Sequence, residues 1–113
     1  MLSGFRCAGV FGKKEICNYP IQGTAFHCLL WSLIQLDRWL AKNKMRTLIV
    51  GQIHDSMLLD VDARELPDVV GRITEIITSD LPRHWPWIIV PLTVEMEGSY
   101  ENWWSKKPLE IAA

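Results

Sequence analysis

The sequence predicts an α+β domain, in which two helices cover one face of a small antiparallel sheet. Apolar residues recur at helical spacing over residues 20–43 and again over 63–80. β-rich residues occupy 47–61, and apolar and polar residues alternate over 89–96. The order helix, hairpin, helix, strand therefore favours a sheet made of the hairpin and one further strand.

The first helix is expected to begin near Pro20, because proline is favoured in the first turn of a helix. Asn18 or Tyr19 would then lie at its N-cap. Residues 1–19 are expected to form an irregular, basic lead-in, since glycines interrupt any helical pattern there. The apolar positions that define the helix are Phe26, Leu29, Leu30, Leu33, Ile34 and Leu40.

A hairpin is predicted between the two helices. Two β-rich runs, 47–53 and 57–61, are separated by His54, Asp55 and Ser56. Asp and Ser are turn residues, because their side chains bond to nearby backbone groups. The segment is therefore expected to be two antiparallel strands with Asp55 at the joint, although no Asn-Gly pair marks the turn.

The second helix has a clearer pattern. Asp62 and Glu65 have the spacing of a capping box, with Asp in place of the usual Ser or Thr. Apolar residues follow on one face from Leu66 to Ile77, and Pro82 is expected to end the helix.

The alternation over 89–96 indicates a strand with one solvent-facing side. Its Pro91 cannot donate a ladder hydrogen bond, so an edge strand is expected. Residues 105–113 are expected to be a tail.

Length and composition exclude several classes of protein. The chain has 113 residues, 49% of them hydrophobic and 22% charged, as expected for one globular domain. No apolar run reaches the ~18 residues of a membrane-spanning helix, and the N-terminus lacks the apolar region of a signal peptide. Three cysteines are an odd number, which favours free thiols in a reducing compartment. A cytoplasmic protein is expected, without a membrane partner.

The charges are unevenly distributed along a chain of net charge −1. Residues 1–60 hold seven Lys and Arg against four Asp and Glu, whereas residues 61–113 hold five against nine. A basic first half permits a local phosphate contact without demanding one.

Asp55 is a candidate metal ligand. A tight turn between two strands would hold its carboxylate at a fixed, exposed position, which suits a divalent cation. The alternative is structural, because an Asp in a turn more often caps its own backbone.

Lys14, Asn18 and Gln22 are candidate nucleic-acid contacts near the start of the first helix. A helix N-terminus attracts phosphate, and Asn and Gln side chains bond to base edges and sugars. The alternative is an ordinary capped helix start, since Asn is a common cap.

Three segments in order resemble the C-terminal end of the family A DNA polymerases, the bacterial polymerase I class. The segments are Asn18-Tyr19-Pro20-Ile21-Gln22-Gly23-Thr24-Ala25, then Gln52-Ile53-His54-Asp55-Ser56, and finally Glu101-Asn102-Trp103-Trp104. The resemblance runs from about residue 12 to residue 104, and the first segment is specific. Its Asn-Tyr-Pro form and the Ser56 are more similar to phage or prophage members.

The resemblance implies that residues 20–104 are part of a polymerase palm. His54 and Asp55 would belong to motif C, in which the Asp binds the catalytic metal and the His lies near the primer end. Ser56 stands where the family has a second carboxylate, Glu. Lys14, Asn18, Gln22 and His54 would contact the template–primer duplex.

The family mechanism uses two magnesium ions about 3.5–4 Å apart, and deoxynucleoside triphosphates as substrates. Its other metal-binding Asp, on motif A, and its nucleotide-binding helix, motif B, have no counterpart in this chain. Asp60 does not replace the missing carboxylate, because it is roughly 16 Å from Asp55 along a strand and faces the other side. The chain is therefore expected to be inactive without an upstream polymerase part.

Two alternatives remain open. One is a remnant that binds DNA without catalysis, although the net charge of −1 disfavours strong binding of its own. The other is a module that associates with itself through apolar surface that a larger protein would cover.

Overall fold

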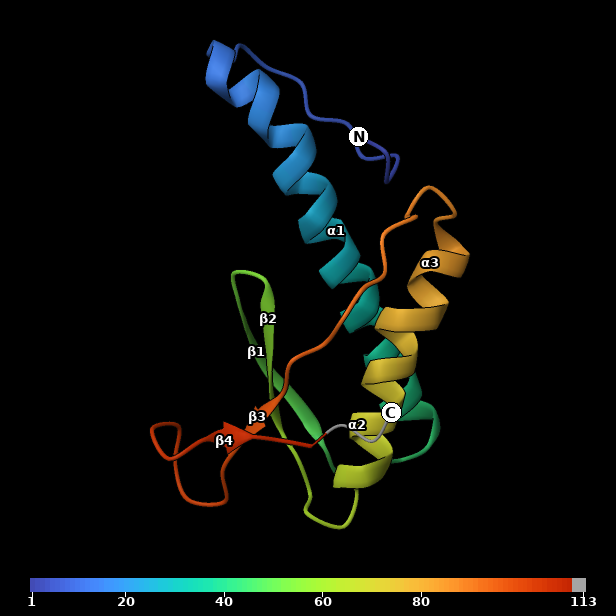
Figure 1. The fold of residues 1–113 in the computed structure, drawn as a ribbon, viewed down its shortest axis with the longest axis vertical. Helices are drawn as coiled ribbons and strands as arrows, with labels where there is room; N and C mark the ends of the chain where they lie inside the picture. Colours follow the sequence, from blue (N-terminus) through green and yellow to red (C-terminus); the bar gives the residue numbers. More distant parts are fainter. Residues whose placement is uncertain (111–113) are drawn as a thin grey trace.

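The computed structural model describes residues 1–110 and has an α+β architecture, as the sequence predicts. It contains a long helix and a second helical segment, with two separate two-stranded antiparallel sheets (Figure 1). Residues 111–113 of the expected tail lie outside the described part. In chain order the elements are α1 (Lys13–Lys42), β1 (Leu48–Ile53), β2 (Ser56–Asp60), α2 (Leu66–Glu75), η1 (Ile76–Asp80), α3 (Leu81–His84), β3 (Glu97–Gly98) and β4 (Lys107–Pro108).

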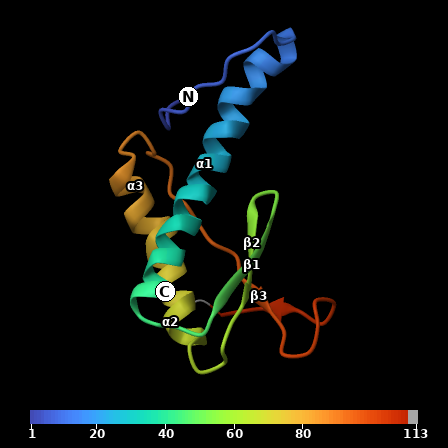
Figure 2. The ribbon, with the colours of Figure 1, turned by 180° about the vertical axis from the view of Figure 1, so that it is seen from behind.

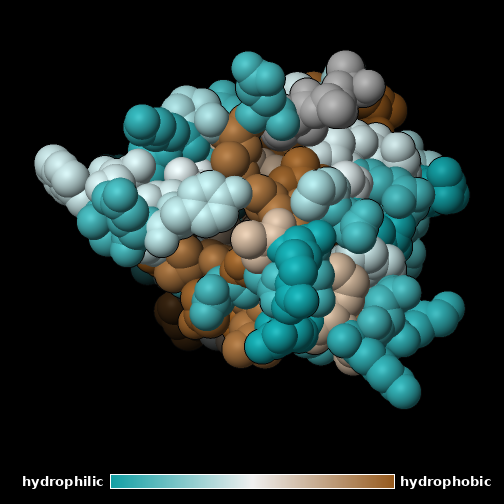
Figure 3. Space-filling view, turned by 90° about the horizontal axis from the view of Figure 1, so that it is seen from below, coloured by the Kyte–Doolittle hydropathy of each residue, from teal (hydrophilic) through white to brown (hydrophobic). Residues whose placement is uncertain are grey.

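The core lies where the C-terminal half of α1 crosses α2 and η1. Leu36 and Leu40 of α1 pack with Val69, Ile73 and Ile76. The hairpin of β1 and β2 adds half-buried side chains to the same cluster, namely Ile49, Met57 and Leu59. Viewed from below, apolar side chains reach the surface between hydrophilic ones (Figure 3).

The first helix begins at Lys13 and not at Pro20, so the expected irregular lead-in is restricted to residues 1–12. The Glu15 side chain accepts the Gly12 backbone N–H at 2.8 Å, which caps the earlier start. Pro20 lies inside the helix, where it removes one backbone hydrogen bond. Thr24 donates its hydroxyl to the Pro20 carbonyl in the next turn.

Because the core contacts only its C-terminal half, α1 projects beyond the body of the molecule. Residues 13–22 are all exposed. Figures 1 and 2 show the N-terminal half of α1, with residues 1–12 running back alongside it, and the tip of the β1–β2 hairpin extending in the same direction, away from the start of α2.

The second helix does not end at Pro82. The helical segment passes from α2 through a single π-helical stretch, η1, into α3 and ends at His84. A proline inside a helix clashes with the carbonyl four residues earlier. The wider turn of η1, directly before Pro82, accommodates that clash.

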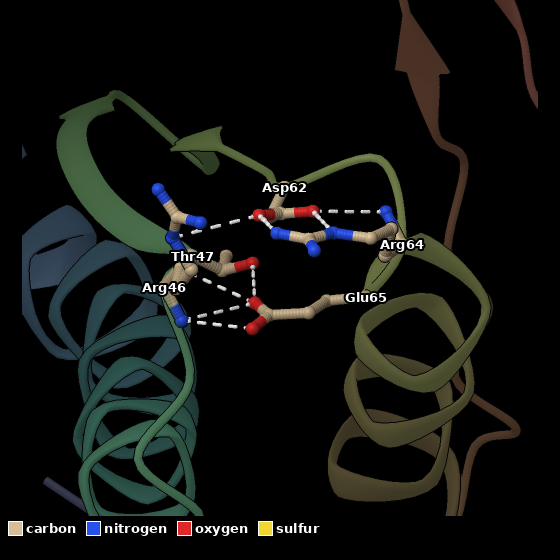
Figure 4. Close-up of polar contacts among 5 residues, drawn as sticks. All are labelled: Arg46, Thr47, Asp62, Arg64 and Glu65. Atoms are coloured by element: carbon tan, nitrogen blue, oxygen red, sulfur yellow. Dashed lines mark hydrogen bonds and ion pairs between the residues drawn. The ribbon is translucent and has the colours of Figure 1, made fainter.

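The expected capping box is also wrong. The Glu65 carboxylate turns away from Asp62 and crosses to the start of β1 (Figure 4). It accepts the backbone N–H groups of Arg46 and Thr47 at 2.9 Å and the Thr47 hydroxyl at 2.6 Å. These bonds lower the pKa of Glu65, with the Arg46 N–H as the largest cause. Glu65 therefore ties the start of α2 to the start of the hairpin.

Residues 89–96 do not form the predicted strand. From Leu92 onward their burial does alternate, with Leu92, Val94 and Met96 half-buried and their neighbours exposed, whereas Val90 is 68% exposed. Within residues 1–110, however, β1 pairs only with β2, and pairing resumes only where Glu97 and Gly98 meet Pro108 and Lys107. A strand needs a neighbour for its ladder, and within the described residues the one cross-strand ladder bond of this segment is at its end, where the Met96 carbonyl accepts the Leu109 N–H at 2.8 Å.

Asp62 should make the stability of the fold depend on pH in the acid range. The Arg64 side chain, which donates to Asp62 at 3.1 and 3.0 Å, lowers the pKa of that carboxyl from 3.8 to about 2. Its stabilising effect is present above the unfolded-state pKa and is lost as the pH falls toward about 2. We therefore expect the free energy of unfolding to fall less in Asp62→Asn than in wild type when the pH is lowered from about 6 to about 3. Urea unfolding at each pH measures this difference. Asp60→Asn, an exposed carboxyl outside this network, should behave like wild type; equal acid sensitivity of Asp62→Asn and wild type would contradict the prediction.

Candidate functional site

The β1–β2 hairpin closes with a two-residue loop, His54 and Asp55. The last paired residues are Ile53 and Ser56. His54 has a φ of 51°, a left-handed conformation that tight hairpin turns require and that is unusual for a residue other than glycine. The loop is therefore held in a conformation that its own residues do not favour.

Two side chains stabilise this loop. The Gln52 amide donates to the His54 carbonyl at 2.8 Å, and the Ser56 hydroxyl donates to the Ile53 carbonyl at 2.8 Å. The sequence did not predict these roles. A detectable signal was present, since a hairpin tip without glycine needs side-chain bonds to hold a left-handed residue.

Asp55 lies exposed at the tip, as predicted, and belongs to no cluster of carboxylates. Among the described residues there is no group of three or more His, Cys, Asp or Glu side chains that could hold a metal ion. Asp60 lies at the opposite end of β2, paired with Leu48. The tip thus presents one carboxylate, in agreement with the expectation that Asp60 does not complete a pair.

Lys14, Asn18 and Gln22 form one exposed line on α1. They are spaced four residues apart, which places them on one face over about 12 Å. Because α1 begins at Lys13, the backbone N–H groups of Asn18 and Gln22 lie inside the helix. The expected phosphate site at a free helix N-terminus therefore does not apply to these two residues, and only their side chains are available to a ligand.

This polar line points toward the side on which the fold packs. Lys14, Asn18 and Gln22 each precede a buried residue of α1 by 18 positions, which is five turns at about 3.6 residues per turn. The buried residues are Ser32, Leu36 and Leu40. Since the hairpin and α2 both pack on that buried side, the polar line and the hairpin tip belong to the same side of α1. The arrangement thus combines the Lys14 ammonium and the amides of Asn18 and Gln22 with a separate carboxylate at the hairpin tip.

The family model of the family A DNA polymerases matches residues 8–105. The chain therefore belongs to the family A DNA polymerases, a family of nucleotidyltransferases, and the resemblance to that family is confirmed. The DNA polymerase of Bacillus phage SP01 is 35% identical over 65 residues. DNA polymerase I is 28% identical over 97 residues in Lactococcus lactis subsp. cremoris and 30% identical over 109 residues in Chloroflexus aurantiacus.

These matches cover 58%, 86% and 96% of this chain, respectively, but only 7%, 10% and 11% of the relatives. The chain thus spans about a tenth of the length of the polymerases it matches. No solved structure matches it significantly. None of the helices in the described residues is long and apolar enough to cross a membrane.

The strained position of His54 gives a testable consequence for stability. Glycine adopts a positive φ without steric cost, whereas a β-branched residue does so poorly. We expect His54→Gly to be at least as stable as wild type, and His54→Val to be less stable by about 1 kcal/mol. Chemical denaturation would measure both. Destabilisation by His54→Gly and none by His54→Val would contradict the turn described here.

Proposed function

We propose that this chain is the C-terminal palm portion of a DNA-directed DNA polymerase and supplies the Asp of motif C. The exposure of Asp55 on a tip that Gln52 and Ser56 hold by hydrogen bonds carries this proposal. A carboxylate held in a fixed position outside the core is available to a divalent metal and to the end of a DNA primer.

The residues at the tip fit half of a two-magnesium site. Asp55 would be a magnesium ligand, and the second carboxylate would come from an upstream polymerase part. Ser56 does not fit the role of the family's Glu, because its hydroxyl is already used in closing the turn. Bound magnesium would neutralise charge on the transferred phosphoryl group. With only one carboxylate, the chain alone is inactive.

The polar line on α1 would contact the template–primer duplex. The Lys14 ammonium pairs with a phosphate, and the Asn18 and Gln22 amides bond to base edges or sugars. His54, next to Asp55 in the loop, would lie near the primer terminus. These residues hold the duplex, while deoxynucleoside triphosphates are bound mainly by the missing part.

A DNA-binding remnant without catalysis is the second candidate. The single carboxylate at the tip favours it, because one ligand does not hold two metal ions. Both candidates predict duplex binding through the polar line, so only catalysis separates them.

The catalytic role of Asp55 can be tested in a hybrid enzyme. This chain replaces the 97 matched residues of the Lactococcus lactis DNA polymerase I, and primer extension is measured with magnesium. We expect extension, and a loss of at least about 10²-fold with Asp55→Asn, because a metal ligand supplies several kcal/mol in the transition state. Asp60→Asn is the matched control and should leave the rate unchanged.

A folded hybrid that binds the duplex but never extends it, even with Ser56→Glu, would favour the non-catalytic remnant. A hybrid that extends equally well with Asp55→Asn would contradict the role of Asp55.

Duplex binding can be tested on the chain itself. Removing one phosphate contact should weaken binding to all sequences and lower the slope of log affinity against log salt by about one. We expect Lys14→Ala to do so in fluorescence-anisotropy titrations of a primer–template duplex. Lys42→Ala changes the same residue type at the other end of α1 and should have little effect. Equal effects of the two substitutions would show that binding does not use the polar line.

A further inference from the structure

The Glu65 carboxylate closes the base of the β1–β2 hairpin, at the end opposite to Asp55. Its two oxygens accept the Arg46 backbone N–H at 2.9 and 3.1 Å (Figure 4). One of them also accepts the Thr47 backbone N–H at 2.9 Å and the Thr47 hydroxyl at 2.6 Å. Thr47, directly before β1, is only 2% exposed. A buried N–H needs an acceptor, and Glu65 supplies it.

Both strands of the hairpin lead to Glu65. β1 is joined to it by these hydrogen bonds, and β2, which ends at Asp60, is joined to it covalently through residues 61–64. α2 begins at the next residue, and its Val69 and Ile73 are buried in the core. Glu65 thus fixes the start of β1 relative to a helix that the core holds in place.

The other contacts of the hairpin fix its direction less well. Ile49, Met57 and Leu59 pack half-buried against the core. Apolar packing is non-directional, whereas a hydrogen bond weakens steeply as it departs from linear geometry. Farther along β1, Val50 and Ile53 are 54% and 47% exposed. Within residues 1–110, β1 pairs only with β2, so no third strand holds its direction.

A small change of direction at the base becomes a large displacement at the tip. The ladder of β1 and β2 continues from Leu48 to Ile53, with one irregularity after Ile49. Thr47 and Ile53 are about 20 Å apart, because a strand rises about 3.3 Å per residue. A swing of about 3° at Thr47 therefore moves the tip by about 1 Å. A displacement of about 1 Å at a reacting centre can cost about 10²-fold in rate.

We propose that Glu65 is a positioning residue: its bonds to Arg46 and Thr47 set the direction of the hairpin and thereby the place of the Asp55 carboxylate in the complete polymerase. This inference rests on the proposed function of Asp55. Glu65 acts through β1 and not by contact with the metal. Its charge does not act on Asp55 through space, because about 20 Å is more than twice the Debye length of about 8 Å at physiological ionic strength.

The neighbouring carboxylate, Asp62, provides a matched control. It lies in the same connection between β2 and α2, and it accepts hydrogen bonds from the backbone and the guanidinium of Arg64. Its contact with Arg46 is to the guanidinium, at 3.7 Å. Asp62→Asn therefore removes one charge from the same loop but leaves the backbone bonds at the start of β1 intact.

The direction of the hairpin can be measured in the full chain by NMR. Residual dipolar couplings of backbone amides report the orientation of the tip relative to α1. We expect Glu65→Ala to change or reduce the couplings of Gln52, Ile53 and Ser56, while those of the C-terminal half of α1 keep their values. Asp62→Asn should leave both sets unchanged. Glu65→Gln keeps one acceptor oxygen and should have a smaller effect; it replaces Glu65→Ala if circular dichroism shows that this variant does not fold.

The catalytic consequence is measured in the hybrid polymerase. We expect Glu65→Ala to lower kcat for primer extension at least about tenfold and to raise the magnesium concentration that gives half the maximal rate. Affinity for the duplex should not change, because the polar line on α1 is not altered. Asp62→Asn should leave all three quantities unchanged. A role of Glu65 in overall stability alone would lower the active fraction and leave the magnesium requirement as it is.

An unchanged tip direction in Glu65→Ala would overturn the proposal. So would equal effects of Glu65→Ala and Asp62→Asn, or a hybrid that depends on Asp55 but keeps its rate and magnesium requirement with Glu65→Ala. A hybrid that does not depend on Asp55 would count against the proposed function alone. The couplings of the tip would then decide whether Glu65 sets the direction of the hairpin.

Discussion

The packing of Leu36 and Leu40 of α1 against Val69 and Ile76 is the contact on which the rest of the structure depends. Only six apolar side chains in the described chain are buried, and most of them meet at this crossing. Burying each contributes about 1.5–3 kcal/mol. One small core thus fixes the C-terminal half of α1, the helical segment from α2 to α3, and the base of the hairpin. The candidate functional residues lie on extensions from it.

These extensions keep their shape through local hydrogen bonds. The N-terminal half of α1 has its own backbone bonds and the Glu15 cap at Gly12, and residues 1–11 pack along it, with Phe11 against Tyr19 and Ser3 within hydrogen-bond distance of His27. An isolated two-stranded hairpin is marginally stable in water. This hairpin is anchored at its base by the core and by Glu65, and closed at its tip by Gln52 and Ser56. Asp55 is therefore positioned from both ends of the hairpin without being buried.

The features that the sequence predicted correctly depend on local information. The hairpin and the place of Asp55 follow from β-rich runs and turn residues that are adjacent in the chain. Pro20 and Pro82 misled the prediction of helix boundaries, because each lies inside a helical segment that other bonds hold. The Gly12–Glu15 cap outweighs the first proline, and a π-helical turn accommodates the second.

Residues 89–96 failed as a strand for a non-local reason. Their alternation correctly predicts that Val94 and Met96 face the core, but a β-ladder depends on whether another strand lies alongside. The functional residues illustrate the same limit. Local pattern alone favoured a capping role for Asp55, and only the order of several motifs over most of the chain identified the family, which the family model then confirmed.

The length of α1 allows one helix to pack in the core at one end and to present a polar line at the other. A line of residues that is buried near its C-terminal end continues, five turns earlier, as the polar line of Lys14, Asn18 and Gln22. A ligand on that line approaches from the side of the hairpin. Pro20 is exposed and lies off this line. Two side-chain bonds flank the backbone bond that Pro20 removes: Glu15 accepts the Gly12 N–H before it, and Thr24 donates to the Pro20 carbonyl after it, so the polar line keeps its helical spacing.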